Sequence, residues 1–142
     1  MNLISSLDKV DAELFRKLCS FVWQIGDLAP LIYNHTDEIY TASGVYFNSL
    51  IHLEEIGLIS FQPVGGYQRM RLPQKLLVLF YAKPFVIEFQ QTENNNLVIG
   101  TVLLSQAGKE LAPICESAPC PGFQEYVLAR WQSMGLRITE VN

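Results

Sequence analysis

The chain has few cations, no long apolar run and no secretory signal, and each absence excludes a class of protein. Its 10 Lys and Arg residues are outnumbered by 14 Asp and Glu residues, giving a net charge of -4. A negative total disfavours proteins that bind nucleic acid through general attraction to phosphates. The longest apolar run, LLVLFYA at 76–82, is far shorter than the roughly 20 residues that cross a bilayer. The first residues, MNLISSLDKVDAEL, lack the basic and apolar regions of a signal peptide, so we expect a cytoplasmic protein.

Soft metal ligands are also scarce. The chain has three cysteines, Cys19, Cys115 and Cys120, and two histidines, His35 and His52. An odd cysteine count without a secretory signal argues against a disulfide framework. Cys115 and Cys120 are separated by four residues, which is not the paired spacing of a structural zinc site. We therefore predict ordinary thiols, no metal and no cofactor.

Recognisable catalytic motifs are missing as well. No glycine-rich phosphate loop is present, and Gly65-Gly66 is explained by a hairpin turn. Neither histidine lies beside a nucleophile elbow. The carboxylate pairs Asp37-Glu38 and Glu54-Glu55 are adjacent in sequence, so on a helix they point in different directions and cannot share a proton. We predict no catalytic residue and a protein that is not an enzyme.

What is present is enough apolar sequence for one packed domain over residues 1–142. The chain is 49% hydrophobic and 17% charged, without linkers or repeats. Between residues 8 and 23, Val10, Leu14, Leu18 and Phe21 recur at helical spacing. Ahead of them, Leu3, Ile4 and Leu7 predict the last turn of another helix. Residues 24–43 mix Gly, Pro, Asn and Asp, which predicts a loop with one short helix.

A second helix is predicted over residues 44–56. Tyr46, Leu50 and Leu53 lie at helical spacing, and Ser43 is the expected N-cap. Gly57 can end the helix in a left-handed conformation, with Leu58 folding back as in a Schellman motif.

Strands follow this helix. Residues 58–61 and 67–72, joined through Gly65-Gly66, predict a hairpin that corresponds to a wing. KLLVLFYA and FVIEFQQ predict a second hairpin around Lys83-Pro84, and LVIGTVLLS one further strand. Ser105 is the expected N-cap of QAGKELAPIC, Pro121 precedes a helix over GFQEYVLARWQSM, and LRITEV returns as an edge strand.

Two short motifs carry a resemblance to winged-helix domains. SLIHLEEIGLISF resembles their LxxLExxGLI stretch, and LLSQAGKEL is similar to the LTxxGxxL segment after the wing in bacterial regulators. A closer resemblance covers most of the chain. DAELFRKLCSFVW, LIHLEEIGLISF, GYQRMRLP, IGTVLLSQAGKELAPIC and GFQEYVLARW resemble the C-terminal part of an uncharacterised bacterial family, domain of unknown function 2806.

That resemblance implies a winged-helix-like α+β domain with a small antiparallel sheet, forming the C-terminal piece of a larger bacterial protein. Fuller members carry a helical segment upstream. The family has no assigned activity, so the resemblance implies no site residues.

The first functional hypothesis is a non-enzymatic protein-interaction module. Exposed tyrosines are enriched in interfaces, although burial in the core is the competing explanation for them. The expected partner is another protein, the upstream helical segment, or a second copy bound through helix 8–23 or helix 121–134. The candidate contact residues are Tyr33, Tyr40, Tyr46 and Tyr67.

The alternative is a DNA-binding regulator that uses helix 44–56 and the wing at 61–72. The helix offers groups able to bond base edges but no cation to hold a phosphate. This alternative predicts a contiguous positive face, whereas the interaction module predicts an uncharged aromatic patch. The candidate DNA contacts are Asn48, Ser49, His52, Arg69, Arg71 and Lys75.

Overall fold

Strands form the middle of the chain and helices flank them, which confirms the predicted α+β class. The computed structural model describes residues 8–141, so the helical turn predicted at Leu3, Ile4 and Leu7 lies outside the described residues. Within this range no helix is both long and apolar enough to span a membrane. In chain order the elements are α2 (Lys9–Cys19), β1 (Val22–Ile25), β2 (Asp27–Pro30), α3 (Glu38–Thr41), α4 (Phe47–Glu55), β3 (Ile59–Phe61), β4 (Tyr67–Leu72), β5 (Lys75–Phe80), β6 (Lys83–Glu88), β7 (Asn95–Gly100), β8 (Val102–Leu104), α5 (Gln106–Leu111), the 3-10 helix η1 (Ala112–Ile114), α6 (Phe123–Ser133) and β9 (Arg137–Glu140).

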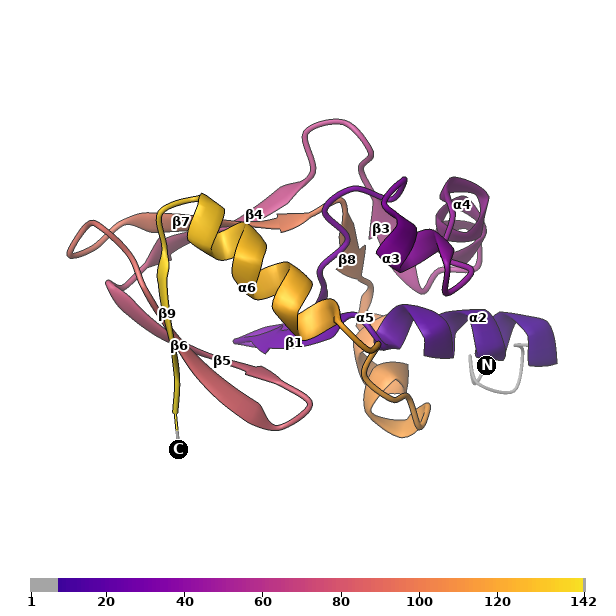
Figure 1. The fold of residues 1–142 in the computed structure, drawn as a ribbon. Coiled ribbons are helices and arrows are strands. Elements are labelled where there is room, and N and C mark those ends of the chain that lie inside the picture. Colours follow the sequence, from indigo (N-terminus) through magenta and orange to yellow (C-terminus); the bar gives the residue numbers. More distant parts are fainter. Residues whose placement is uncertain (1–7, 142) are drawn as a thin grey trace.

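The largest sheet is antiparallel and has the strand order β2-β1-β5-β6-β9. The predicted hairpin of β5 and β6 and the predicted C-terminal edge strand β9 are confirmed. The hairpin turn is Tyr81-Ala82, not Lys83-Pro84, because Lys83 and Pro84 already pair with Phe80 and Leu79. Figure 1 shows α2, α3 and α4 gathered at one end of the molecule and the strands extending from them.

The predicted wing hairpin is wrong, because β3 and β4 do not pair with each other. β3 pairs with β8, and β4 pairs with β7. Both partners come from the stretch predicted as one strand, which breaks at Gly100. Gly100 has a φ of +104°, and a Cβ there would lie 2.5 Å from the carbonyl oxygen of Ile32. The chain therefore turns sharply between two separate two-stranded ribbons, a long-range arrangement that no local turn signal reveals.

The first helix is shorter than predicted and buries a different face. It ends at Cys19, and its buried residues are Phe15, Leu18 and Cys19, whereas Val10 is 75% exposed. Phe21 and the residues after it lead into β1, where period-two strand geometry replaces helical spacing. The region predicted as a loop with one short helix contains the β1–β2 hairpin, with Gly26 between the strands, as well as the short helix α3.

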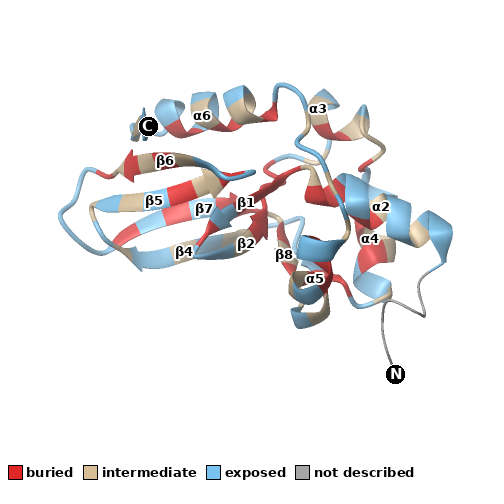
Figure 2. Ribbon diagram, turned by 90° about the horizontal axis from the view of Figure 1, so that it is seen from below, coloured by how far each residue is buried: buried red, intermediate tan, exposed pale blue. Residues whose placement is uncertain are grey.

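One part of the core lies between the five-stranded sheet and α6, which crosses in front of the strands in Figure 1, and the same cluster continues to the buried residues of α2 and α4. Trp131 of α6 meets Trp23 of β1 edge to face, with ring centroids 5.0 Å apart, and Trp23 also stacks on Phe80 at 4.9 Å. Phe123 and Val127 are buried on the same helix, whereas Met134 is 41% exposed. Figure 2 shows the resulting stripe of buried positions along α6.

The end of α4 and the start of α5 are joined by hydrogen bonds. Gly57 adopts a φ of +86°, and the Leu58 amide donates to the Leu53 carbonyl at 3.0 Å, which confirms the predicted Schellman motif. Ser105 caps α5 as predicted, since its hydroxyl accepts from the Gly108 amide at 3.1 Å. The same hydroxyl donates to the Gly57 carbonyl at 2.6 Å. The two segments that carry the winged-helix resemblance are therefore packed directly against each other.

Candidate functional site

Helix α4 begins later than predicted, and this exposes Tyr46. The N-cap is Tyr46, with φ −116° and ψ 174°, so Ser43 is not the cap. Leu50 and Leu53 are buried as predicted. Because Tyr46 is extended and not helical, it does not share their face, and its side chain is 52% exposed.

Tyr46 begins a cluster that we call the aromatic patch, formed by Tyr46, Phe47, His35 and Phe61. Phe47 is 44% exposed, yet it packs against Phe61 with ring centroids 5.5 Å apart. His35 lies 5.5 Å from Phe47 and 5.9 Å from Phe61. Phe61 is buried and belongs to β3, so it restrains the exposed ring of Phe47. The patch therefore presents one restrained ring, Phe47, and the neighbouring exposed ring of Tyr46 to solvent at the start of a helix.

The predicted contact residues Tyr33 and Tyr40 are not on the surface. Tyr33 is 8% exposed, and its hydroxyl accepts from the Trp131 indole at 2.9 Å and donates to the Val98 carbonyl at 3.0 Å. Tyr40 is fully buried and donates to the Leu31 carbonyl at 2.6 Å. Burial raises the pKa of both phenols. Both tyrosines therefore belong to the core, where each hydroxyl provides a hydrogen-bond partner for a backbone carbonyl.

Tyr67 is half-buried at the start of β4. Its hydroxyl lies 2.8 Å from the Ser60 hydroxyl of β3, which bridges two strands that are not paired with each other. Of the four predicted tyrosines, Tyr46 and Tyr67 thus keep surface accessible to a partner.

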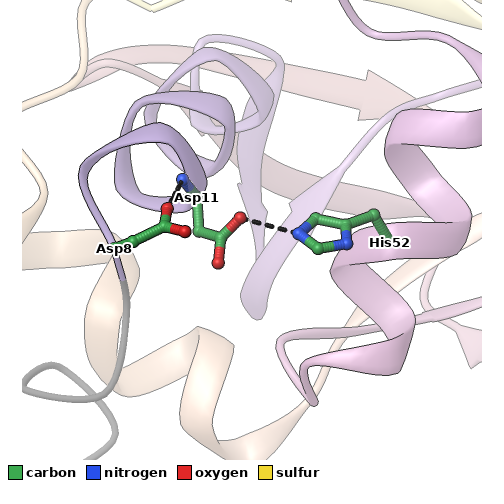
Figure 3. A network of polar contacts seen from close by, with 3 residues as sticks. All are labelled: Asp8, Asp11 and His52. Atoms are coloured by element: carbon green, nitrogen blue, oxygen red, sulfur yellow. Dashed lines mark hydrogen bonds and ion pairs between the residues drawn. The ribbon is translucent and has the colours of Figure 1, made fainter.

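The middle of α4 is tied to α2 through a histidine. His52 Nε2 lies 2.6 Å from Asp11 Oδ1, and Asp8 accepts from the Asp11 amide at 2.7 Å as the N-cap of α2 (Figure 3). The hydrogen bond to Asp11 raises the pKa of His52, and the nearby carboxylate of Glu55 acts in the same direction. The DNA hypothesis needs the His52 ring to contact a base edge, but the ring is hydrogen-bonded to the Asp11 carboxylate.

The remaining DNA candidates on α4 do not form a cationic surface. Asn48 is exposed, but the Ser49 hydroxyl donates to the Gly44 carbonyl at 3.0 Å. Asp11, Glu54 and Glu55 bring acidic groups to the same helix region. Their charge opposes the approach of a phosphate backbone.

The cations of β4 are also arranged differently from the prediction. The pairing of β4 with β7 shifts register between Arg69 and Leu72, and Arg71 has a φ of +59°, so regular strand geometry is interrupted between the two arginines and Leu72. Arg69 is half-buried and Arg71 is exposed. Lys75 lies 4.0 Å from Glu88, which offsets part of its charge.

The cysteines are free thiols. Cys19 is buried, whereas Cys115 and Cys120 are half-buried. A hydrogen bond from Cys19 lowers the pKa of Cys115 to about 7, and the same interaction together with burial raises the pKa of Cys19. Among residues 8–141 no group of three or more His, Cys, Asp or Glu side chains is placed to hold a metal ion.

Sequence reasoning missed Phe47, His35 and Phe61. The available signal was the pair Tyr46-Phe47 shortly before the buried Leu50, because a helix that begins at 47 places Tyr46 at its N-cap and Phe47 in its first turn. His35 gave no such signal, since its position depends on how the loop before α3 folds over β3.

Fold and surface together define a mixed α+β domain with an aromatic patch on a helix that is tied to its neighbours. The chain belongs to the family described as protein of unknown function, DUF2806, whose model matches residues 1–128. Comparison with curated proteins and with solved structures gives no match.

Proposed function

We propose that this domain is a non-enzymatic protein-interaction module that docks a partner on the aromatic patch. In this proposal α4 occupies the place of the recognition helix of a winged-helix domain, but it contacts protein. The partner is another protein chain or a segment upstream in the same protein. The observation that carries the proposal is the exposure of Tyr46 and Phe47, at 52% and 44%, with Phe47 packed on the buried ring of Phe61.

Two features of the patch support protein docking. Aromatic side chains provide most of the large binding contributions in protein interfaces, and they do so best when few rotamers must be frozen. Phe47 is already restrained by Phe61 and His35, so binding would cost it little conformational entropy. The polar rim supplied by Asn48 and the acidic groups further along α4 favours a partner with an apolar centre and basic flanks.

The experiment introduces a photo-crosslinking residue at Phe47 in cells that make the protein naturally, with the same residue at Met70 as control. Met70 is 61% exposed but lies on β4, outside the patch. A protein that is captured from position 47 but not from position 70 is then purified, and its affinity for the domain is measured by calorimetry. Phe47→Ala and Tyr46→Ala are each expected to weaken binding about 30-fold, since aromatic hot spots contribute about 2 kcal/mol or more.

Met70→Ala is expected to change the affinity less than threefold, and circular dichroism verifies that every variant is folded. Equal capture from both positions, or a partner whose affinity is unchanged by Phe47→Ala, contradicts the proposal. The partner could also be a second copy of the same chain, and sedimentation over a range of protein concentrations tests this form of the proposal.

The DNA-binding alternative has less support. It requires cations near α4, whereas His52 is engaged by Asp11 and the helix carries Glu54 and Glu55. Arg69 and Arg71 remain its best candidates, although the bulge in β4 separates them.

A further inference from the structure

A cavity of about 540 Å³ lies on the face of the five-stranded sheet opposite α6, because its lining residues Gln24 and Leu79 alternate along their strands with Trp23 and Phe80, and Trp23 packs against α6. Leu79 of β5 contributes to one wall together with Gln24 and Leu28 from the paired strands β1 and β2. Ala112 and Pro113 of η1 form the opposite wall. Its volume falls in the range of about 300–1,000 Å³ that is typical of sites for small organic molecules. The cavity is separate from the aromatic patch, since none of the patch residues lines it.

Backbone strain is concentrated around this cavity. Among the described residues five non-glycine positions have positive φ, and three of them, Tyr81, Ala82 and Glu116, line the cavity. The Tyr81-Ala82 turn has φ values of 49° and 67°, a conformation that glycine and asparagine adopt at far lower cost. Strained residues of this kind persist where the surrounding structure fixes them and gather at ligand sites.

Hydrogen bonds hold the strained turn in place. The Tyr81 hydroxyl donates to the Cys19 carbonyl at 2.8 Å, and the Ser117 hydroxyl lies 2.7 Å away and donates to Tyr81 in return. Burial raises the pKa of Tyr81. These bonds join the end of α2, the hairpin turn and the segment after η1, so the ring of Tyr81 forms a fixed part of the cavity wall.

The charge of the lining identifies the class of ligand. Glu116 is the one charged residue among those that line the cavity, and within residues 8–141 it forms no ion pair. A single carboxylate in a lining that is otherwise largely apolar and includes Tyr81 matches an organic cation, which gains an ion pair and apolar contacts.

We propose that this cavity is a binding site for a small, largely apolar amine, with Glu116 holding the ammonium group and Tyr81 and Leu79 contacting its apolar body. This site is independent of the aromatic patch, so loss of one function leaves the other intact.

The test measures binding of phenethylamine by two-dimensional amide NMR and calorimetry, in parallel with phenethyl alcohol and hydrocinnamate as neutral and anionic analogues. A ligand of this size is expected to bind with a Kd on the order of 1 mM, with amide shifts at Leu28, Leu79 and Ser117. The alcohol should bind about tenfold more weakly and hydrocinnamate more weakly still.

Glu116→Gln is expected to reduce the affinity for the amine about tenfold and to leave that for the alcohol unchanged. Glu110→Gln, which removes the same charge from an exposed position on α5, should change neither. The proposal is overturned if the amine causes no shifts at these residues, if the alcohol binds as tightly as the amine, or if Glu116→Gln and Glu110→Gln have equal effects.

Discussion

Replacing Gly108 by alanine tests how α4 and α5 are joined. Gly108 lies in α5 and is buried. In an exposed helix this substitution stabilises a protein by about 1 kcal/mol, because alanine has the higher helix propensity. Here a Cβ would lie 2.2 Å from the carbonyl oxygen of Leu58, a distance at which backbone atoms must move apart. Steric contact therefore predicts that Gly108→Ala lowers the free energy of unfolding, whereas helix propensity predicts that it raises it.

The magnitude follows from the contacts that must adjust. Separating α5 from Leu58 lengthens the bond from the Ser105 amide to the Leu58 carbonyl, now 3.0 Å, and the bond from the Ser105 hydroxyl to Gly57, now 2.6 Å. Overpacking costs about 1–3 kcal/mol and each weakened bond up to about 1 kcal/mol, against a gain of about 1 kcal/mol from propensity. The net expectation is a loss of about 2 kcal/mol, which lowers the Tm by about 6 °C for a chain of this size.

The assay is urea unfolding followed by circular dichroism, with a calorimetric scan for the Tm. Gln106→Ala, at an exposed position of the same helix, serves as control and should change the free energy of unfolding by less than about 0.5 kcal/mol. A Gly108→Ala protein that is more stable than the original would refute the packing argument, because helix propensity alone would then account for the result.

Three further predictions use other parts of the chain. Ala82→Gly should raise the free energy of unfolding by about 0.5 kcal/mol in urea titrations, because relief of left-handed strain exceeds the added backbone entropy, and a destabilised variant would contradict the strain at φ 67°. Asp11→Asn should return the raised pKa of His52 towards 6.5, the usual value of a histidine, as followed by NMR titration of the ring protons. Since the pKa of His52 is raised in the folded state, the stability that this pair contributes is fully present below the unfolded pKa and is lost as the pH rises through the folded pKa, so Asp11→Asn should destabilise the protein more at acidic than at alkaline pH. Fluorescence anisotropy of a generic DNA duplex should stay flat as protein is added even at low salt, whereas binding that weakens with salt and with Arg69→Ala and Arg71→Ala would restore the regulator hypothesis.

Features set by neighbouring residues could be predicted from the sequence. The cap at Gly57, the cap at Ser105 and the β5–β6 hairpin each depend on residues within a few positions of one another. Strand partners could not be predicted in the same way. β3 and β4 are joined by a glycine turn, yet each pairs with a strand much further along the chain, as Ile59 with Leu104 and Leu72 with Asn95 show, because burial of Leu97, Ile99 and Val102 favours this pairing.

The candidate site was predicted only in part, for a related reason. The sequence shows where the tyrosines are, but it does not show which of them are exposed and which are buried. Tyr33 lies in the loop after β2 and Tyr40 lies in α3, and inside the core their hydroxyls donate to the carbonyls of Val98 and Leu31. Tyr46 is exposed because the helix starts one residue after it, a boundary that differs from the predicted one by three residues.

Helix α4 is fixed along its whole length, and this matters for the proposed function. Its start is held by Phe47 on Phe61, its middle by His52 on Asp11, and its end by the Leu58 cap, on which α5 is packed. A partner that binds the patch therefore does not have to order the helix, and this part of the entropy cost of binding is avoided. The same argument separates the two functional hypotheses. The side chains that hold α4 in place include His52, which the DNA hypothesis needs free, whereas they leave Tyr46 and the outer face of Phe47 exposed to a protein partner.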